Sequence, residues 1–114
     1  TYGYSESLKG ETLASSRNFY STLAVRQAGN IESDKYASRR LLHGIVIHGM
    51  QYTDAAYRQL PTTYFSESSG VGEVLSYMRD NGALRIGVIG MGIGTLTAYA
   101  RAGDFVRFYE INPQ

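Results

Sequence analysis

Three glycines at alternate positions, Gly90, Gly92 and Gly94, follow an apolar run, and Glu110 lies about 20 residues after the first of them. Glycines in such a loop allow the chain to turn sharply off a strand and allow a ligand to approach the backbone. The segment after the loop is helix-like, and a helix N-terminus offers free N–H groups and a positive dipole end. An acidic side chain that ends the next strand can accept both hydroxyl hydrogens of a ribose. The pattern predicts a nucleoside site, against the alternative of a structural glycine turn with a surface glutamate.

The spacing within the loop narrows the class of nucleoside. The dinucleotide fingerprint G-x-G-x-x-G requires a third glycine where this chain has Thr95. No lysine directly follows the loop, which excludes a phosphate loop of the Walker type. The spacing G-x-G-x-G resembles instead the first motif of S-adenosylmethionine-dependent enzymes.

Three further side chains could line a pocket, although each also has an ordinary structural interpretation. Gln51 follows a predicted strand and could reach the glycine loop, where an amide can recognise both an amino and a carboxyl group. Taken alone, it is better interpreted as a surface residue. Tyr57 and Tyr64 could form walls of a pocket, but a packed, half-exposed ring is the more ordinary role.

His43 and His48 are the only histidines of the chain. On a single strand their spacing would point them to opposite faces, which argues against a shared metal site. Each precedes a glycine, so they could shape the strand ends, or one of them could line a pocket. No spacing indicates a Ser-His-Asp arrangement or a pair of catalytic carboxylates.

The first half of the chain is expected to form an antiparallel hairpin. Alternating apolar residues predict half-buried strands at residues 17–27 and 40–48, after an entry segment with at most one edge strand. An apolar stripe then predicts a helix that begins after Ser69 and is stopped by Asn81-Gly82.

The second half is expected to form a strand–loop–helix–strand unit. The apolar run 84–89 predicts a strand that is covered on both faces. The glycine loop, a helix at 95–102 and a strand at 105–111 follow, which predicts two parallel strands with a right-handed connection. Two such strands alone would leave apolar surface and a bare sheet edge. We therefore expect a fragment, or a chain whose edge a partner covers.

The composition excludes several classes of protein. The 114 residues carry 11 Lys and Arg against 10 Asp and Glu, a formal net charge of +1, whereas a nucleic-acid clamp needs a basic patch. The chain has no cysteine, which excludes disulfides and thiolate metal sites. The most apolar stretch, residues 86–98, is shorter than the ~20 residues of a membrane span. We therefore expect no metal, no nucleic acid and no membrane contact by this segment.

Three runs, RRLLHGIVIHGMQY, PTTYFSESSGVGEV and RIGVIGMGIGTLTAYARAGDFVRFYEINP, resemble the spermidine synthase (polyamine aminopropyltransferase) family. The likeness begins near Arg17, and it points to the spermidine synthase-like domains that can be fused to membrane transporter segments. It implies an α/β fold, with an antiparallel β-hairpin region at residues 1–50 and an incomplete Rossmann-like, methyltransferase-type parallel sheet at 51–114. It further implies a homodimer, located in the cytoplasm or as the soluble domain of a membrane-fused protein.

The resemblance also implies roles for individual residues. Gln51 matches a glutamine that contacts the aminopropyl donor, decarboxylated S-adenosylmethionine, and Glu110 matches the acid on the ribose hydroxyls. Ile111 falls where the next residue flanks the adenine, and Tyr64 falls near the family's Tyr-His pair, with Phe65 in place of the histidine. The complete set implied to contact the donor is Gln51, Tyr64, Gly90, Met91, Gly92, Gly94, Glu110 and Ile111.

The sequence departs from the family at functionally important positions. Ile93 stands where the polyamine-forming enzymes have an aspartate that helps to hold the donor's amino group. The family's catalytic aspartate and acceptor-binding acids correspond to positions after Gln114, so no catalytic residue is assigned and this piece alone is expected to be inactive. The implied reaction is aminopropyl transfer to an amine. Alternatives are an S-adenosylmethionine-dependent methyltransferase, a non-catalytic nucleoside-sensing or assembly module, and a nicotinamide-dependent enzyme.

Overall fold

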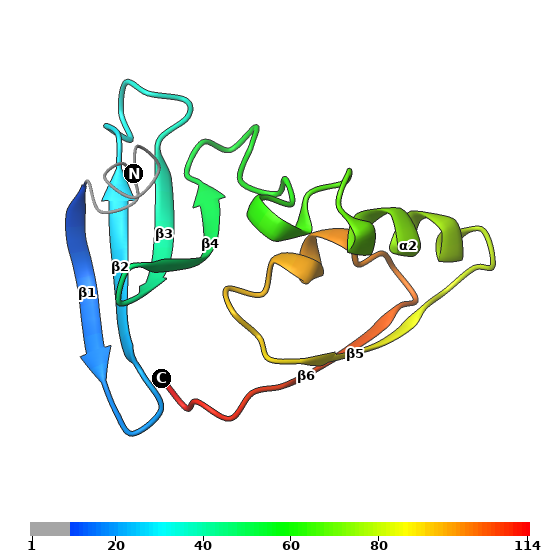
Figure 1. The fold of residues 1–114 in the computed structure, drawn as a ribbon. Helices are drawn as coiled ribbons and strands as arrows, with labels where there is room; N and C mark the ends of the chain where they lie inside the picture. Colours follow the sequence, from blue (N-terminus) through cyan, green and yellow to red (C-terminus); the bar gives the residue numbers. More distant parts are fainter. Residues whose placement is uncertain (1–9) are drawn as a thin grey trace.

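The computed structural model describes residues 10–114 and has two sheets (Figure 1). A four-stranded antiparallel sheet has the strand order β1-β2-β3-β4, and a separate parallel sheet contains β5 and β6. Helix α2 and two short 3-10 helices, η1 and η2, connect them. The fold is therefore mixed α/β. The bounds are β1 Glu11–Arg17, β2 Thr22–Ala28, β3 Ser38–His43, β4 Val46–Tyr52, η1 Thr63–Phe65, α2 Gly70–Arg79, β5 Arg85–Ile89, η2 Thr95–Tyr99 and β6 Phe105–Tyr109.

The prediction of one strand at residues 17–27 is wrong, because this range contains the last residue of β1, a turn and most of β2. Asn18 makes this turn, because its backbone N–H donates to the Ser21 carbonyl at 3.0 Å and its side-chain Oδ1 accepts from Tyr20 N–H at 2.9 Å. Phe19 lies at the tip of the turn and is 95% exposed, instead of contributing to a buried face. The edge strand expected in the entry segment is β1, whereas residues 1–9 lie outside the described residues.

The prediction of a single strand at residues 40–48 is also wrong. It is divided at Gly44, which has φ +59°, into β3 and β4 of an antiparallel hairpin. The register shifts after Leu41, which pairs with Gly49, so that Leu42 pairs with Ile47. This bulge leaves His48 as the extra residue. The expected antiparallel pairing of the two predicted strands is confirmed, since β2 pairs with β3.

The helix predicted after Ser69 is confirmed as α2. Ser69 is its N-cap, where Oγ accepts from Gly72 N–H at 3.2 Å. Gly72 fits closely under the preceding turn, because a Cβ there would lie 2.5 Å from the Ser66 carbonyl oxygen. Leu75 is buried, whereas the neighbouring Val74 is 55% exposed.

Replacing Ser69 with alanine is expected to lower the free energy of unfolding by about 1 kcal/mol, because the Gly72 N–H loses its cap acceptor. Urea unfolding followed by circular dichroism measures this change. Ser76→Ala, at an exposed position inside the same helix, is the matched control and is expected to be neutral or slightly stabilising. Equal unfolding midpoints for the two variants would contradict the capping role.

The two strands around the glycine loop are parallel as predicted, with Arg85 opposite Phe105 and Ile89 opposite Tyr109. Their connection differs from the prediction, because η2 spans only five residues in place of a helix at 95–102. The prediction that β5 is covered on both faces is also wrong, since Ile89 is 94% exposed.

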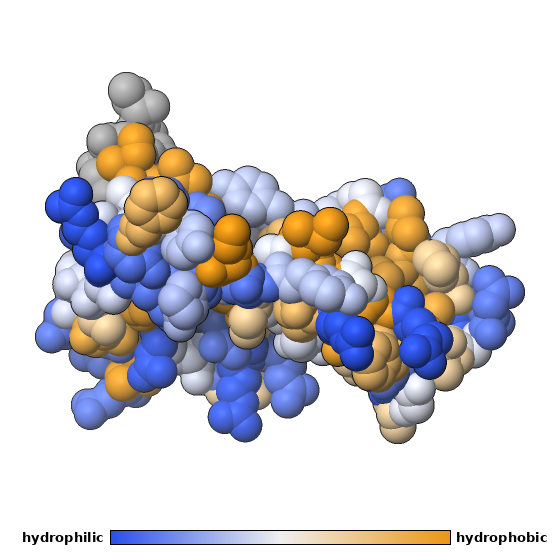
Figure 2. All heavy atoms as spheres, turned by 90° about the horizontal axis from the view of Figure 1, so that it is seen from below, coloured by the Kyte–Doolittle hydropathy of each residue, from blue (hydrophilic) through white to orange (hydrophobic). Residues whose placement is uncertain are grey.

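The underside of the molecule shows apolar and strongly hydrophilic side chains next to one another (Figure 2). The Arg85 and Arg107 guanidinium groups lie 5.1 and 5.3 Å from the Phe105 ring centre, so cations cover part of this exposed ring. Within residues 10–114 no helix is long and apolar enough to cross a membrane.

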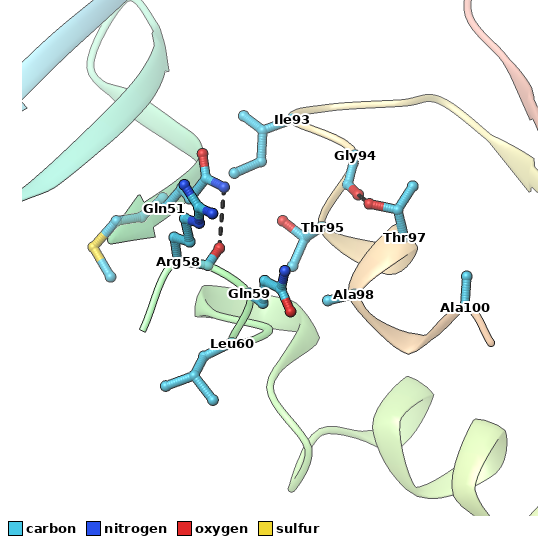
Figure 3. Close-up of a pocket in the computed structure, with 11 residues that line it drawn as sticks. Gln51, Arg58, Gln59, Leu60, Ile93, Gly94, Thr95, Thr97, Ala98 and Ala100 are labelled. Carbon is cyan, nitrogen blue, oxygen red and sulfur yellow. Dashed lines mark hydrogen bonds between the residues drawn. The ribbon is translucent and has the colours of Figure 1, made fainter. Parts of the chain in front are cut away.

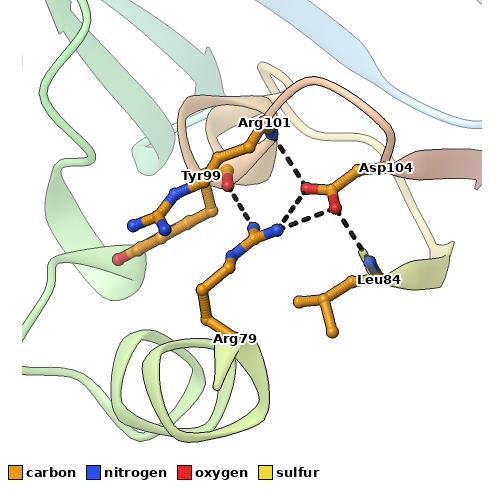
Figure 4. Close-up of polar contacts among 5 residues, drawn as sticks. All are labelled: Arg79, Leu84, Tyr99, Arg101 and Asp104. Atoms are coloured by element: carbon orange, nitrogen blue, oxygen red, sulfur yellow. Dashed lines mark hydrogen bonds and ion pairs between the residues drawn. The ribbon is translucent and has the colours of Figure 1, made fainter. Parts of the chain in front are cut away.

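A buried ion pair fixes α2 against both parallel strands (Figure 4). Arg79, the last residue of α2, donates to both carboxylate oxygens of Asp104 at 2.7 Å and to the Tyr99 carbonyl. Asp104 also accepts from the backbone N–H groups of Leu84 and Arg101 at 2.8 Å. Its side chain is 1% exposed. The pair therefore joins the starts of β5 and β6, at the opposite end of the strands from the glycine loop.

Candidate functional site

The structure brings Glu110 to the glycine loop. Since parallel strands end at the same edge of a sheet, the residue after β6 lies beside the loop that follows β5. Glu110 Oε2 accepts from Met91 N–H at 2.7 Å, and Oε1 accepts from Asn112 N–H at 2.8 Å. Gly90 N–H donates to the Tyr109 carbonyl at 2.8 Å, which extends the pairing of the strands into the loop.

Hydrogen bonds keep the Glu110 carboxylate ionised. The Met91 N–H, followed by the N–H of Asn112, lowers the pKa of Glu110 below its ordinary value, and the charge of nearby His48 adds to this effect. An ionised carboxylate has about four acceptor positions, and the N–H groups of Met91 and Asn112, with a smaller contribution from that of Ile111, occupy part of them. The rest of this capacity is open to donors from a ligand.

The glycine loop uses a backbone conformation that favours glycine. Gly90, Gly92 and Gly94 have φ values of +82°, +55° and +75°, all in the left-handed region. A Cβ at Gly90 would contact nothing within 4 Å, so the requirement at this position is conformational and the space beside it is open. This open backbone is what a ligand that approaches the loop closely would need.

A cleft of about 570 Å³, here called the larger cleft, lies between the antiparallel sheet and the glycine loop. This volume is within the usual range for a small-molecule site. Its walls include Gly90, Met91, Gly92 and Glu110 from the predicted set, together with His43, His48 and Asn112.

The two histidines lie close together, contrary to the prediction that they point to opposite faces. Their ring centres are 5.7 Å apart, because the Gly44 turn places them on adjacent strands of one hairpin. In the sequence, the two His-Gly pairs are the only feature that draws attention to these histidines. The Gly44 turn and the bulge at His48 bring both side chains to the wall of the larger cleft. Among residues 10–114, no three His, Cys, Asp or Glu side chains gather as metal ligands do.

Asn112 stabilises one wall of the larger cleft through side-chain hydrogen bonds. This residue was not identified from the sequence. Its Oδ1 accepts from Asn18 Nδ2 and its Nδ2 donates to Ser21 Oγ, each at 2.7 Å. Gln114 Nε2 adds a hydrogen bond to Ser16 Oγ. These contacts hold the segment after Glu110 against the β1–β2 turn.

A second cleft of about 440 Å³, here called the smaller cleft, is lined by the last residues of the glycine loop and by the segment after β4 (Figure 3). Gln51 lines it together with Ile93, Gly94 and Thr95. Gln51 Nε2 donates to the Arg58 carbonyl at 3.0 Å. The predicted site residues are therefore distributed over two clefts, Gln51 and Gly94 in the smaller and the other loop residues with Glu110 in the larger.

The remaining predicted residues line neither cleft. Tyr64 is 65% exposed and contacts the Phe65 ring edge-on, with ring centres 6.5 Å apart. Ile111 is 73% exposed. Tyr57 stacks on Tyr36 at 5.6 Å between ring centres, within a surface cluster of tyrosines, which agrees with its ordinary structural interpretation.

Comparisons of this chain with protein-family models, with curated proteins and with solved structures find no match.

Proposed function

We propose that this chain binds an adenosyl donor, decarboxylated S-adenosylmethionine or S-adenosylmethionine, as the nucleoside-binding part of a spermidine synthase-like transferase with a Rossmann-like sheet. The observation that carries the proposal is the hydrogen bond between Glu110 Oε2 and Met91 N–H. It places an ionised acceptor beside an open glycine backbone, in a cleft large enough for a nucleoside.

The ribose is the part of the ligand that this geometry suits. Its two adjacent hydroxyls would donate to the Glu110 carboxylate oxygens, at the acceptor positions that the backbone N–H groups leave available. Gly90 and Gly92 let the nucleoside approach the backbone, because neither carries a side chain on that wall of the cleft.

Two reactions would use such a donor. The resemblance supports aminopropyl transfer, in which a deprotonated amine attacks the carbon beside the sulfonium and the sulfur leaves as a neutral thioether. Methyl transfer is the second candidate, because Ile93 weakens the link to polyamine formation. A Cβ on Gly49 would lie 2.5 Å from Ile93 Cγ1, so this side chain packs on β4 and supplies no polar group for an aminopropyl ammonium.

Calorimetric titration with 5′-methylthioadenosine tests nucleoside binding without either transferable group. We expect saturable binding, with affinity at least about tenfold weaker for the 2′-deoxy analogue, because one charge-assisted hydrogen bond to Glu110 is lost. NAD is the control for the nicotinamide alternative and is expected not to bind. Absence of binding, or equal affinity for the two analogues, would contradict the proposal.

A further inference from the structure

The smaller cleft has a charge that does not suit a cationic ligand. Among the residues that the structure describes, 11 line this cleft, and of these Arg58 is the only charged one and none is acidic (Figure 3). Aminopropyl donors and polyamines carry ammonium groups, which sites recognise with carboxylates. A cleft with a guanidinium and no carboxylate in its lining is instead complementary to an anion.

Asp54, the acidic residue nearest to Arg58 in the sequence, has other partners. Asp54 Oδ1 accepts from Ala56 N–H at 2.8 Å, which holds this carboxylate in its own turn. The charge of Asp54 also acts on Lys35, outside the smaller cleft. Within residues 10–114 no ion pair joins Arg58 to an acidic side chain, so its charge can act on a ligand in the cleft.

Two neutral groups add polar contacts beside Arg58. Thr95 Oγ1 is buried and has no hydrogen-bond partner within the described part of the chain. A buried hydroxyl without a partner is unusual and points to a missing acceptor. The Gln51 amide is oriented by its Nε2 hydrogen bond to the Arg58 carbonyl, so its Oε1 is the end that can accept from an ammonium.

Neighbouring residues of the glycine loop line the two clefts. Gly92 lines the larger cleft and Gly94 the smaller, and two residues of extended chain span at most about 7 Å. A nucleoside whose ribose is held by Glu110 could therefore extend its sulfur substituent across the loop into the smaller cleft.

We propose that the smaller cleft binds the amino-acid end of S-adenosylmethionine, with Arg58 and Thr95 on its carboxylate and Gln51 on its ammonium. This assignment rests on the proposed function and makes it specific. The chain then prefers the carboxylated donor to the decarboxylated one, because only the carboxylate compensates the Arg58 charge. The preference supports methyl transfer over aminopropyl transfer.

The test is calorimetry of both donors with the wild-type chain and Arg58→Gln. We expect S-adenosylmethionine to bind at least about tenfold more tightly than its decarboxylated form, as one charge-assisted contact predicts. Arg58→Gln should remove most of this preference, because it weakens the binding of S-adenosylmethionine and leaves the binding of the decarboxylated donor unchanged. The variant keeps the backbone carbonyl that Gln51 uses, and Arg58 is exposed, so circular dichroism should show an unchanged fold. Arg101→Gln, which removes the same charge outside the cleft, is the matched control.

The outcomes separate this inference from the proposed function. Equal affinities, tighter binding of the decarboxylated donor, or equal weakening of both donors by Arg58→Gln would overturn the inference. If 5′-methylthioadenosine still binds in those cases, nucleoside binding stands without the carboxylate subsite. If neither donor nor 5′-methylthioadenosine binds, the proposed function is wrong and the inference is overturned with it.

Discussion

Glu110→Ala is expected to weaken nucleoside binding at least about 100-fold, because two hydrogen bonds from the ribose to an ionised acceptor are lost together. The same change removes the acceptor of Met91 N–H, so the loop loses the contact that joins it to the end of β6. Titration of 5′-methylthioadenosine measures the loss. Glu110→Gln, which keeps the size of the side chain, should lose about tenfold.

The 2′-deoxy analogue separates direct contact from a disturbed loop. If Glu110 contacts the ribose, the ribo and deoxy analogues should bind Glu110→Ala with equal, weak affinity. If the alanine variant still distinguishes them as the wild type does, the ribose is held elsewhere. Glu73→Ala, in the first turn of α2 and outside both clefts, is the control for loss of one acidic group.

The lowered pKa of Glu110 determines how nucleoside affinity should depend on pH. Because backbone N–H groups hold this pKa below the ordinary 4.5, the carboxylate stays ionised at pH 5. Nucleoside affinity should therefore be level between pH 8 and about 5 and fall only at lower pH. A loss of affinity that is already complete above pH 5 would contradict the role of Glu110 as the controlling group.

Asp104→Ala is the substitution expected to destabilise the fold most. It leaves the Arg79 side chain, only 14% exposed, without its counter-charge, and it removes the acceptor of two backbone N–H groups. We expect the melting temperature to fall by at least about 10 °C. Asp80→Asn, an exposed acid at the end of α2, should change it little. A melting temperature for Asp104→Ala equal to that of Asp80→Asn would contradict the structural role.

The same carboxylate predicts sensitivity to acid. Hydrogen bonding to Arg79, and then to the N–H groups of Leu84 and Arg101, lowers the pKa of Asp104 from its ordinary 3.8 to about 2. A depressed pKa contributes stability that is complete above the unfolded value and is lost as pH falls toward the folded value. Wild-type stability should therefore decrease between about pH 4 and pH 2. Asp104→Asn should lack this part of the dependence, as denaturant unfolding at several pH values would show.

Local sequence features predicted α2, the parallel strands and the glycine loop. Ser69 at the cap, the apolar stripe and the following glycine act within a few residues, so their effect can be read from the chain. The meeting of Glu110 with the loop was also predictable, because adjacent parallel strands bring their carboxyl ends together.

Periodicity could not locate the two hairpin turns. Alternation of apolar and polar residues continues through a short turn, so residues 17–27 and 40–48 each had the pattern of one strand. Gly44 and Asn18 turn the chain instead, through a left-handed backbone and a side-chain hydrogen bond. The consequence for the site is large, because the Gly44 turn brings the two histidines into the larger cleft.

The sequence by itself determined the motif of glycines and an acid on which the proposed nucleoside site rests, since these residues belong to one local strand–loop–strand unit. Only the tertiary structure decided what faces that motif. Asn112 reaches Asn18 across 94 residues of sequence, and Arg58 lines the same cleft as Gly94. No spacing along the chain encodes such contacts, because they depend on how the two sheets are placed. The physical reason is that hydrogen bonds and charges act over a few ångströms in space, whatever the separation in sequence.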